Sequence, residues 1–396
     1  MISSNRGANY LDIFRGRFIR QAPHFWEYAA MVALALGLTL FIHRRAAKLS
    51  YAVIALVFIA VNAAIFLLFF KGYIWVDQIS FNLALILPSA LIMVSKFAGE
   101  EEHRQFIQGA FSKYLSQDVI DQIIENPDAL KLGGESCNIT TFFSDVAGFS
   151  TISEKLSAEG LVHLLNEYLS EMTDIIMDNK GTVDKYEGDA IMAFWGAPLA
   201  FPEHPYQACF SAMLMQRRLS ELREAWRKEG RHELRVRMGI NSGPAVAGNM
   251  GSRTRMNYTV MGDSVNLASR LEGANKVYGT YSMVSGSTRA AVGDRFQFRE
   301  LDTIRVVGKS EPIVVHELLE EPGKAPDSVE SLLVHYDEGL ALYKARRWKD
   351  AAIRFVKALK IDMTDGPSKV YYRRCMAFLK TPPPVAWDGV HNLSSK

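Results

Sequence analysis

Two aspartates occupy positions at which a protein can bind divalent cations. Asp145 ends an apolar stretch in FFSDVAGFST (142–151), and Asp189 follows a tight turn in KYEGDAIMAFWG (185–196). Two carboxylates at adjacent strand ends can hold a pair of hard cations about 4 Å apart, an arrangement suited to chemistry at phosphorus. A single aspartate near a glycine is more often a turn or cap residue, so neither residue identifies a site alone.

A predicted helix start after Asp145 offers a place for phosphate. The backbone N–H groups at a helix N-terminus lack helical partners and lie at the positive end of the helix dipole, so they favour an anion. The residues expected to open this helix are Gly148, Phe149, Ser150 and Thr151.

Further polar positions lie downstream. Asn266 and Arg270 in NYTVMGDSVNLASRLE (257–272) are four residues apart, so a helix puts them on one face. A neutral donor beside a guanidinium suits a ribose oxygen and a developing phosphoryl charge, although a solvated helix face gives the same spacing. Lys309 follows Gly308 in a predicted turn, which means little alone.

Five motifs that contain these residues occur in one order between residues 143 and 312. They are FSDVAGFS, KYEGDAIMAFWGAP, GINSGPAVAG, YTVMGDSVNLASRLE and VVGKSEP. The ordered set resembles the class III nucleotidyl cyclases, in particular the bacterial adenylate cyclases. The resemblance covers roughly residues 108–320. The pattern FxxYLSxxVxxxI at 111–123 is similar to the short transducing segment that precedes these domains.

The resemblance implies a role for each of these positions. Asp145 and Asp189, assisted by the Val146 carbonyl, would bind two Mg²⁺ or Mn²⁺ ions. One ion would activate the ribose 3′-hydroxyl, and the other would hold the β- and γ-phosphates. Asn266 would orient the ribose and Arg270 would stabilise the transition state. Lys309 would contact the terminal phosphates.

Base selection is implied at two more positions. Lys185 and Thr259 match the residues that contact the purine: Lys can donate to adenine N1, and a Thr hydroxyl can accept from the 6-amino group. Guanine-selective members have an acid and often a Cys there, and this chain has neither. Thr259 stands where many animal enzymes have Asp. The expected reaction converts ATP to 3′,5′-cyclic AMP and pyrophosphate in intracellular signal transduction.

The family geometry also implies a homodimer. Its metal and purine sites face each other across a head-to-tail interface, and this chain carries both halves, so two equivalent sites are expected. The alternatives are a guanylate cyclase and a catalytically silent nucleotide-binding receptor. The string GGES at 133–136 resembles diguanylate cyclases only superficially, because it lies before the first predicted strand.

The elements that must position these residues alternate from about residue 136 onward. Strands are expected at 138–143, 182–186, 190–195 and 236–240, with a helix after the first strand and another that ends near residue 227. This β-α-β-β-α-β order is ferredoxin-like and predicts an α+β catalytic domain over 136–320. One more helix is expected over 264–271.

Three apolar segments precede this domain, at about 25–43, 49–70 and 72–94. Each approaches the roughly 20 apolar residues that span a bilayer, so we expect three transmembrane helices. The alternative, three buried helices of a soluble core, would need a very large core. No signal peptide is evident in the first 24 residues.

Basic residues predict the orientation of these helices. The loop after the first segment holds Arg44, Arg45 and Lys48, so it should face the cytoplasm, and the third segment then ends inside near Lys96. The catalytic domain is therefore expected in the cytoplasm of a multi-pass protein of the cell membrane. This places residues 1–24 outside, in conflict with their arginines (Arg6, Arg15, Arg17 and Arg20). Two explanations stay open: the first segment does not span the membrane, or residues 1–24 are the remnant of an exported domain. In the wider family such helices often follow a large extracytoplasmic sensor, which would here be lost or truncated.

The remaining segments complete the expected organisation. We expect a helical connector over residues 98–135 and a linker over residues 321–327. Residues 328–380 resemble one tetratricopeptide repeat, which must dock on the catalytic domain or on an unknown protein partner. Residues 381–396 are expected to be loose. The 45 basic and 43 acidic residues argue against a nucleic-acid polymer as a partner, and three scattered cysteines argue against a disulfide framework.

Overall fold

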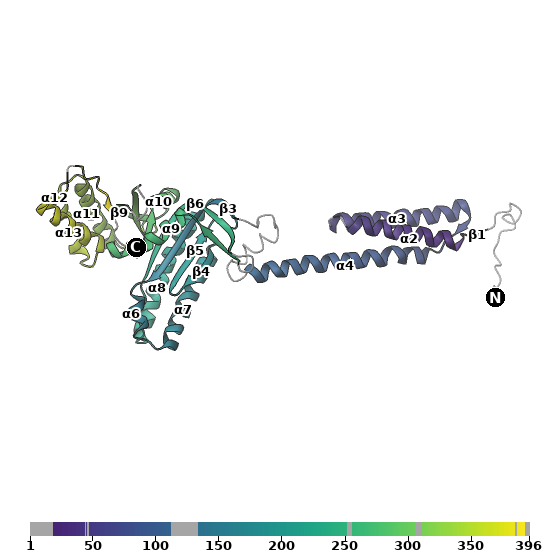
Figure 1. Cartoon of the computed structure of the whole chain (residues 1–396), viewed down its shortest axis with the longest axis horizontal. Helices are drawn as coiled ribbons and strands as arrows, with labels where there is room; N and C mark the ends of the chain where they lie inside the picture. The colour runs from purple at the N-terminus through teal and green to yellow at the C-terminus, as the bar shows by residue number, and fades with distance from the viewer. Residues whose placement is uncertain are drawn as a thin grey trace. The chain divides into compact units, whose positions relative to one another are not determined.

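The computed structural model describes residues 19–43, 45, 47–111, 134–251, 256–305, 311–384 and 386–392 (Figure 1). They belong to two compact units, Met1–Gln108 and Gly109–Lys396. Lys309, connector residues 112–133 and residues 393–396 lie outside the described residues. The expectation of a loose tail is wrong for His391 and Asn392, which pair with Ile304 and Arg305 as an edge strand.

The first unit contains the helices α2 (His24–His43) and α3 (Ala47–Gly72) and most of α4 (Gln78–Phe111). By length and composition each could cross a membrane, over His24–Ile42, Leu49–Gly72 and Gln78–Gly99. The third helix begins at Gln78 rather than at residue 72. The reason is that Ile74–Trp75 (β2) pairs in parallel with Arg20–Gln21 (β1).

Polar side chains join these helices at two levels. Asn62 Nδ2 on α3 donates to Asn82 Oδ1 on α4 at 3.0 Å, and Gln78 Nε2 donates to Asn62 Oδ1 at 2.7 Å. Near the other end of α4, Lys96 Nζ donates to the Ile42 carbonyl at 2.6 Å. An ammonium group favours the carbonyls at a helix C-terminus. Lys96 and the α2–α3 loop therefore lie at the same end of the bundle.

The second unit is built on one mixed sheet in the order β11-β9-β10-β8-β6-β3-β5-β4, with β7 paired to β6. The pairs β6/β8 and β9/β11 are parallel and the others are antiparallel. The strands are β3 (Glu135–Val146), β4 (Thr182–Glu187), β5 (Ala190–Trp195), β6 (Val236–Gly251), β7 (Met256–Met261), β8 (Ser282–Ser285), β9 (Gln297–Arg305), β10 (Ile313–Glu320) and β11 (His391–Asn392).

Helices cover both faces of this sheet. They are α6 (Phe149–Ser153), α7 (Ala158–Asp178), α8 (His204–Lys228), α9 (Asp263–Tyr278), α10 (Gly286–Val292), the 3₁₀ turn η2 (Gly293–Arg295), α11 (Asp327–Lys344), α12 (Trp348–Ile361) and α13 (Gly366–Lys380). The expected β-α-β-β-α-β order runs from β3 to β6, and strands β7 to β11 extend it.

Strand alternation divides the core between the two faces, because successive side chains of a strand point to opposite sides. On β5, Ile191, Ala193 and Trp195 join the core under α7 and α8. Met192 and Phe194 on the same strand face the opposite side and pack with residues of β7 and α9. Helix α9 therefore lies on the face opposite α7 and α8.

The C-terminal helices α11 to α13 dock on β9 and β10 through buried polar contacts. Arg299 on β9 is 6% exposed; its Nη1 donates to Asp365 Oδ1 at 2.7 Å and its Nε donates to Glu317 Oε2 at 2.8 Å. The Tyr371 hydroxyl on α13 donates to the Leu301 carbonyl at 2.6 Å. The segment thus buries its inner face on the sheet, while its likeness to a tetratricopeptide repeat stays a prediction.

Arg299→Ala is expected to lower the free energy of unfolding of the second unit by about 3–5 kcal/mol, because Glu317 and Asp365 would remain buried without a counter-charge. Arg347→Ala is the matched control, since Arg347 and Asp350 form an exposed pair within α12 and its N-cap. Denaturant unfolding of the full chain in detergent measures both. Equal losses in the two variants would refute the role given to Arg299.

Candidate active site

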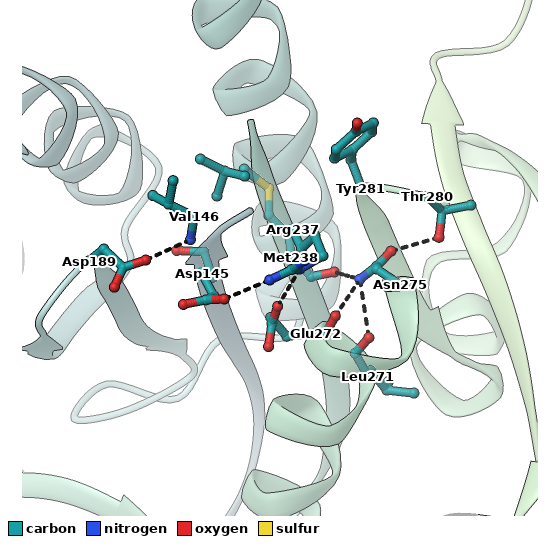
Figure 2. A network of polar contacts seen from close by, with 12 residues as sticks. Asp145, Val146, Asp189, Arg237, Met238, Leu271, Glu272, Asn275, Thr280 and Tyr281 are labelled. Atoms are coloured by element: carbon teal, nitrogen blue, oxygen red, sulfur yellow. Dashed lines mark hydrogen bonds and ion pairs between the residues drawn. The ribbon is translucent and has the colours of Figure 1, made fainter. Parts of the chain in front are cut away.

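The two predicted acids meet at one end of β3. Asp145 is the next-to-last residue of β3, and Asp189 lies in the turn between β4 and β5, after Gly188 with φ +70°. The β3–β5 register pairs Ser144 with Ile191, which brings that turn beside the strand end. The Val146 N–H donates to Asp189 Oδ2 at 3.0 Å (Figure 2).

The electrostatics of this pair favour a cation. Burial raises the pKa of Asp189 and the charge of Asp145 raises it further, while the Val146 N–H lowers it. Two facing carboxylates repel each other, and a positive ion between them removes that cost. Among the described residues no group of three or more His, Cys, Asp or Glu could hold a metal. Two carboxylates nevertheless fit Mg²⁺, which keeps waters and takes further ligands from substrate phosphates.

Arg237 is part of this site and was missed in the sequence. Its Nη2 donates to Asp145 Oδ2 at 2.7 Å and its Nε to Glu272 Oε1 at 2.9 Å, with its side chain only 11% exposed (Figure 2). Burial opposes its charge, but the bonds to Glu272 and Asp145 raise the pKa of Arg237 overall. The available signal was strand alternation: Val236 and Met238 face one side of β6, so Arg237 faces the other.

The predicted phosphate residues follow β3 directly. Gly148 caps the short helix α6 with φ 73° and ψ 24°, in the left-handed region that glycine adopts without strain. The Thr151 N–H already donates to the Gly148 carbonyl at 3.0 Å. The Thr151 N–H is therefore already paired within the chain.

Lys185 and Thr259, the two residues predicted to contact the purine, both lie next to Asp184. Thr259 on β7 is buried, and its hydroxyl donates to Asp184 Oδ2 on β4. The Lys185 Nζ lies 3.6 Å from Asp184 Oδ1, with the Lys185 side chain 41% exposed. Asp184 was not singled out in the sequence. Its position is set by a register shift between Val183 and Lys185, which inserts one extra residue into β4.

Asn266 and Arg270 lie on one outward face of α9. Asn266 is exposed and Arg270 is half-buried, and within the part of the chain that the structure describes neither side chain has a hydrogen bond or an ion pair. Both groups are therefore available to a ligand.

The position of α9 itself is fixed along β6. The buried Asn275 Nδ2 donates to the Met238 carbonyl at 2.9 Å (Figure 2). The Asn241 Nδ2 donates to the Ser264 carbonyl at 2.8 Å. Between these contacts, β6 approaches so closely that a Cβ on Gly239 would lie 2.2 Å from the Ala268 carbonyl oxygen.

Comparison with known proteins identifies the domain. Residues 134–319 match the family model described as the adenylate and guanylate cyclase catalytic domain. Adenylate cyclase 1 of Rhizobium meliloti (strain 1021) is 37% identical over 212 residues, which are 53% of this chain and 31% of the relative. The adenylate cyclase of Anabaena cylindrica is 33% identical over 52% of this chain and 41% of its own length. The crystal structure of the adenylyl cyclase CyaB from P. aeruginosa is 36% identical and covers 49% of this chain and 100% of that chain, with a TM-score of 0.46.

The matched residues are a nucleotidyl cyclase catalytic domain, and they contain the strand end, the turn and the helix described above. Residues 134–319 belong to the class III adenylate/guanylate cyclase family, as the ordered motifs predicted. The chain spans less than half the length of the two curated relatives named here.

Proposed function

We propose that this chain is an adenylate cyclase that converts ATP to 3′,5′-cyclic AMP and pyrophosphate in intracellular signalling. The observation that carries the proposal is the meeting of Asp145 and Asp189 at one strand end, in a domain of the cyclase family. Asp145, Asp189 and the Val146 carbonyl would hold two Mg²⁺ or Mn²⁺ ions. When bound, such ions supply Lewis-acid stabilisation of charge at the phosphates and the 3′-oxygen.

The chain's own residues bind and orient the nucleotide. Gly148, Phe149 and Ser150 present backbone N–H groups to phosphate. Asn266 orients the ribose by hydrogen bonding, and the Arg270 guanidinium stabilises negative charge that grows at the α-phosphate. Lys309 is proposed to contact the terminal phosphates.

Lys185 and Thr259 are proposed to select adenine. A Lys ammonium donates to N1, which is an acceptor in adenine and carries a proton in guanine. The wrong base would leave a buried donor or acceptor unpaired, at a cost of about 1–3 kcal/mol per group. This supports ATP rather than GTP as the substrate.

Each active site is proposed to form between two chains. The metal-binding carboxylates would come from one protomer, and Lys185, Thr259, Asn266 and Arg270 from its partner. The outward face of α9, on which Asn266 and Arg270 have no hydrogen bond or ion pair to other described residues, supports this arrangement. We further propose that α2, α3 and α4 span the cell membrane, with the catalytic domain in the cytoplasm. The C-terminal helices are proposed to be a tetratricopeptide-like segment whose outer face remains open to a protein partner.

The test is direct. The full chain, purified in detergent, is expected to form cyclic AMP and pyrophosphate from ATP in the presence of Mn²⁺ or Mg²⁺, and to stop when a chelator removes the metal. Initial rates with ATP and GTP decide the base. Absence of product from ATP at every protein concentration would refute the proposal.

Gly239→Ala is expected to lower kcat/KM about 10²-fold, because the new Cβ meets backbone atoms of α9 and must displace Asn266 and Arg270. Gly160→Ala is the control, since its Cβ would approach only Ser157 Oγ, at 3.3 Å. Steady-state cyclase kinetics and thermal unfolding of both variants separate a displaced helix from an unfolded domain. A fully active Gly239→Ala chain would contradict this account of how α9 is positioned.

A further inference from the structure

A threonine beside a purine does not by itself select a base. The hydroxyl has one proton to donate and two lone pairs that accept, and it rotates freely between these roles. It can therefore accept from the 6-amino group of adenine or donate to the 6-oxo group of guanine. Something else in the protein must fix the direction of the Thr259 O–H bond if Thr259 is to discriminate.

Asp184 is positioned to fix that direction. It is 6% exposed, and its Oδ2 accepts the hydrogen bond from the Thr259 hydroxyl. An ionised carboxylate has no proton to give, so the hydroxyl must be the donor in this contact. The lone pairs of Thr259 Oγ1 are then left for a second partner, which must be a donor.

Three neighbours of Asp184 favour its ionised, acceptor form. Burial raises the pKa of Asp184 overall, and the Thr259 hydroxyl, the charge of Lys185 and the Val260 backbone N–H act in the opposite direction. Its second oxygen, Oδ1, is buried and lies 3.6 Å from Lys185 Nζ, an ion-pair separation beyond normal hydrogen-bond length. Oδ2 thus accepts a hydrogen bond from Thr259, while Oδ1 faces the Lys185 ammonium without a hydrogen bond from the described residues.

The backbone explains why Asp184 can reach both residues. The extra residue in β4 changes the alternation, so that Thr182, Val183 and Asp184 are all buried while Lys185 is exposed. Asp184 therefore points into the protein toward β7, and the next residue, Lys185, projects to the surface beside it. The bulge therefore places Asp184 beside both Lys185 and Thr259, the residues proposed to contact the purine.

We propose that Asp184 is the positioning residue that sets base selectivity: by taking the Thr259 hydroxyl proton, it leaves the hydroxyl as a dedicated acceptor for the 6-amino group of ATP. The inference rests on the proposed adenylate cyclase function and assigns the specificity of that site to a residue that does not itself touch the base. In Asp184→Asn, one acceptor oxygen is replaced by a donor NH₂ group. The Thr259 proton can then turn toward a 6-oxo group, and GTP becomes a better substrate.

The experiment compares initial rates with ATP and GTP for the full chain in detergent. Asp184→Asn is expected to lower the ratio of kcat/KM for ATP to that for GTP about tenfold, the worth of one hydrogen bond. Glu187→Gln is the matched control, because it makes the same change from acid to amide at an exposed position on the same strand, and it should keep the wild-type ratio.

A double-mutant cycle with Thr259→Val shows whether Asp184 acts through Thr259. Once the hydroxyl is gone, adding Asp184→Asn should change the ratio no further. Additive effects of the two substitutions, or an Asp184→Asn chain that loses rate equally with both nucleotides, would overturn the inference and leave Asp184 a packing residue.

The same measurements also distinguish failure of the proposed function from failure of the inference about Asp184. A wild-type chain that makes no cyclic AMP, or prefers GTP, refutes the proposed function rather than the role of Asp184. If Asp184→Asn fails to fold, as judged by thermal unfolding, Asp184→Ser replaces it. The Ser side chain is neutral and shorter, so the same fall in the ATP:GTP ratio is expected, and an unchanged ratio counts against the inference.

Discussion

Arg270→Ala is expected to lower kcat for cyclic AMP formation about 10³-fold or more, with a much smaller change in KM. An arginine that meets the charge developing on a transferring phosphoryl group is worth about 10³–10⁵ in rate, because the interaction strengthens in the transition state. Steady-state kinetics with ATP measure both constants.

The structure makes this substitution unusually easy to interpret. Within the described residues Arg270 has no hydrogen bond or ion pair, so its removal leaves no buried group unpaired. Helix α9 stays held by Asn275 and Asn241. Lys276→Ala is the control: it removes a positive charge from the exposed surface of the same helix and should leave kcat unchanged. If Arg270→Ala instead raises KM without lowering kcat, Arg270 contributes to ground-state binding and not to the transition state.

Local sequence patterns predicted the strand and the turn that position Asp145 and Asp189. The strand at 190–195 was expected from its apolar run after a glycine turn, and β5 is Ala190–Trp195. That turn places Asp189, and the end of the preceding apolar strand places Asp145. The pairing of the two acids followed from the expectation that the two strand ends are neighbours, which the β3–β5 register bears out.

Residues that act through long-range register were not predictable in the same way. Arg237 meets Asp145 because β6 pairs with β3 over its length. Asp184 meets Thr259 because β4 carries an extra residue and packs near β7. No local period in a single sequence marks a bulge, since one inserted residue looks the same as an ordinary polar interruption. Both residues therefore emerged only from the fold.

The length of β6 shows a related limit. The alternating residues 236–240 predicted a short strand, and Gly and Pro, which follow at 243 and 244, usually interrupt a strand. The strand instead continues to Gly251, where it pairs with β7 and positions Thr259 opposite Gly248. Tertiary pairing overrides local propensity here, and the extension is what brings one of the proposed purine contacts to the site.

Two inactive chains are expected to restore activity when they form a mixed dimer. Asp145→Asn disables the proposed metal half-site, and Arg270→Ala disables the proposed transition-state half-site. Asn is preferred to Ala at position 145 because its carbonyl oxygen can still accept from Arg237. A purified mixed dimer, isolated through a different tag on each chain, contains one site with both halves intact. Its rate should be about half that of the wild-type dimer, since two equivalent sites are related by the two-fold axis.

A second mixed dimer distinguishes active sites shared between chains from active sites formed within one chain. A chain that carries both Asp145→Asn and Arg270→Ala is paired with a wild-type chain. If sites are shared, each of the two sites receives one damaged half and the dimer is nearly inactive. If sites lie within one chain, the wild-type chain keeps a complete site and about half the activity remains. Initial rates of cyclic AMP formation distinguish these outcomes, and the contrast does not depend on how much either substitution weakens dimerisation once the mixed dimer is isolated. Activity in this second pairing, together with inactivity in the first, would refute the head-to-tail dimer.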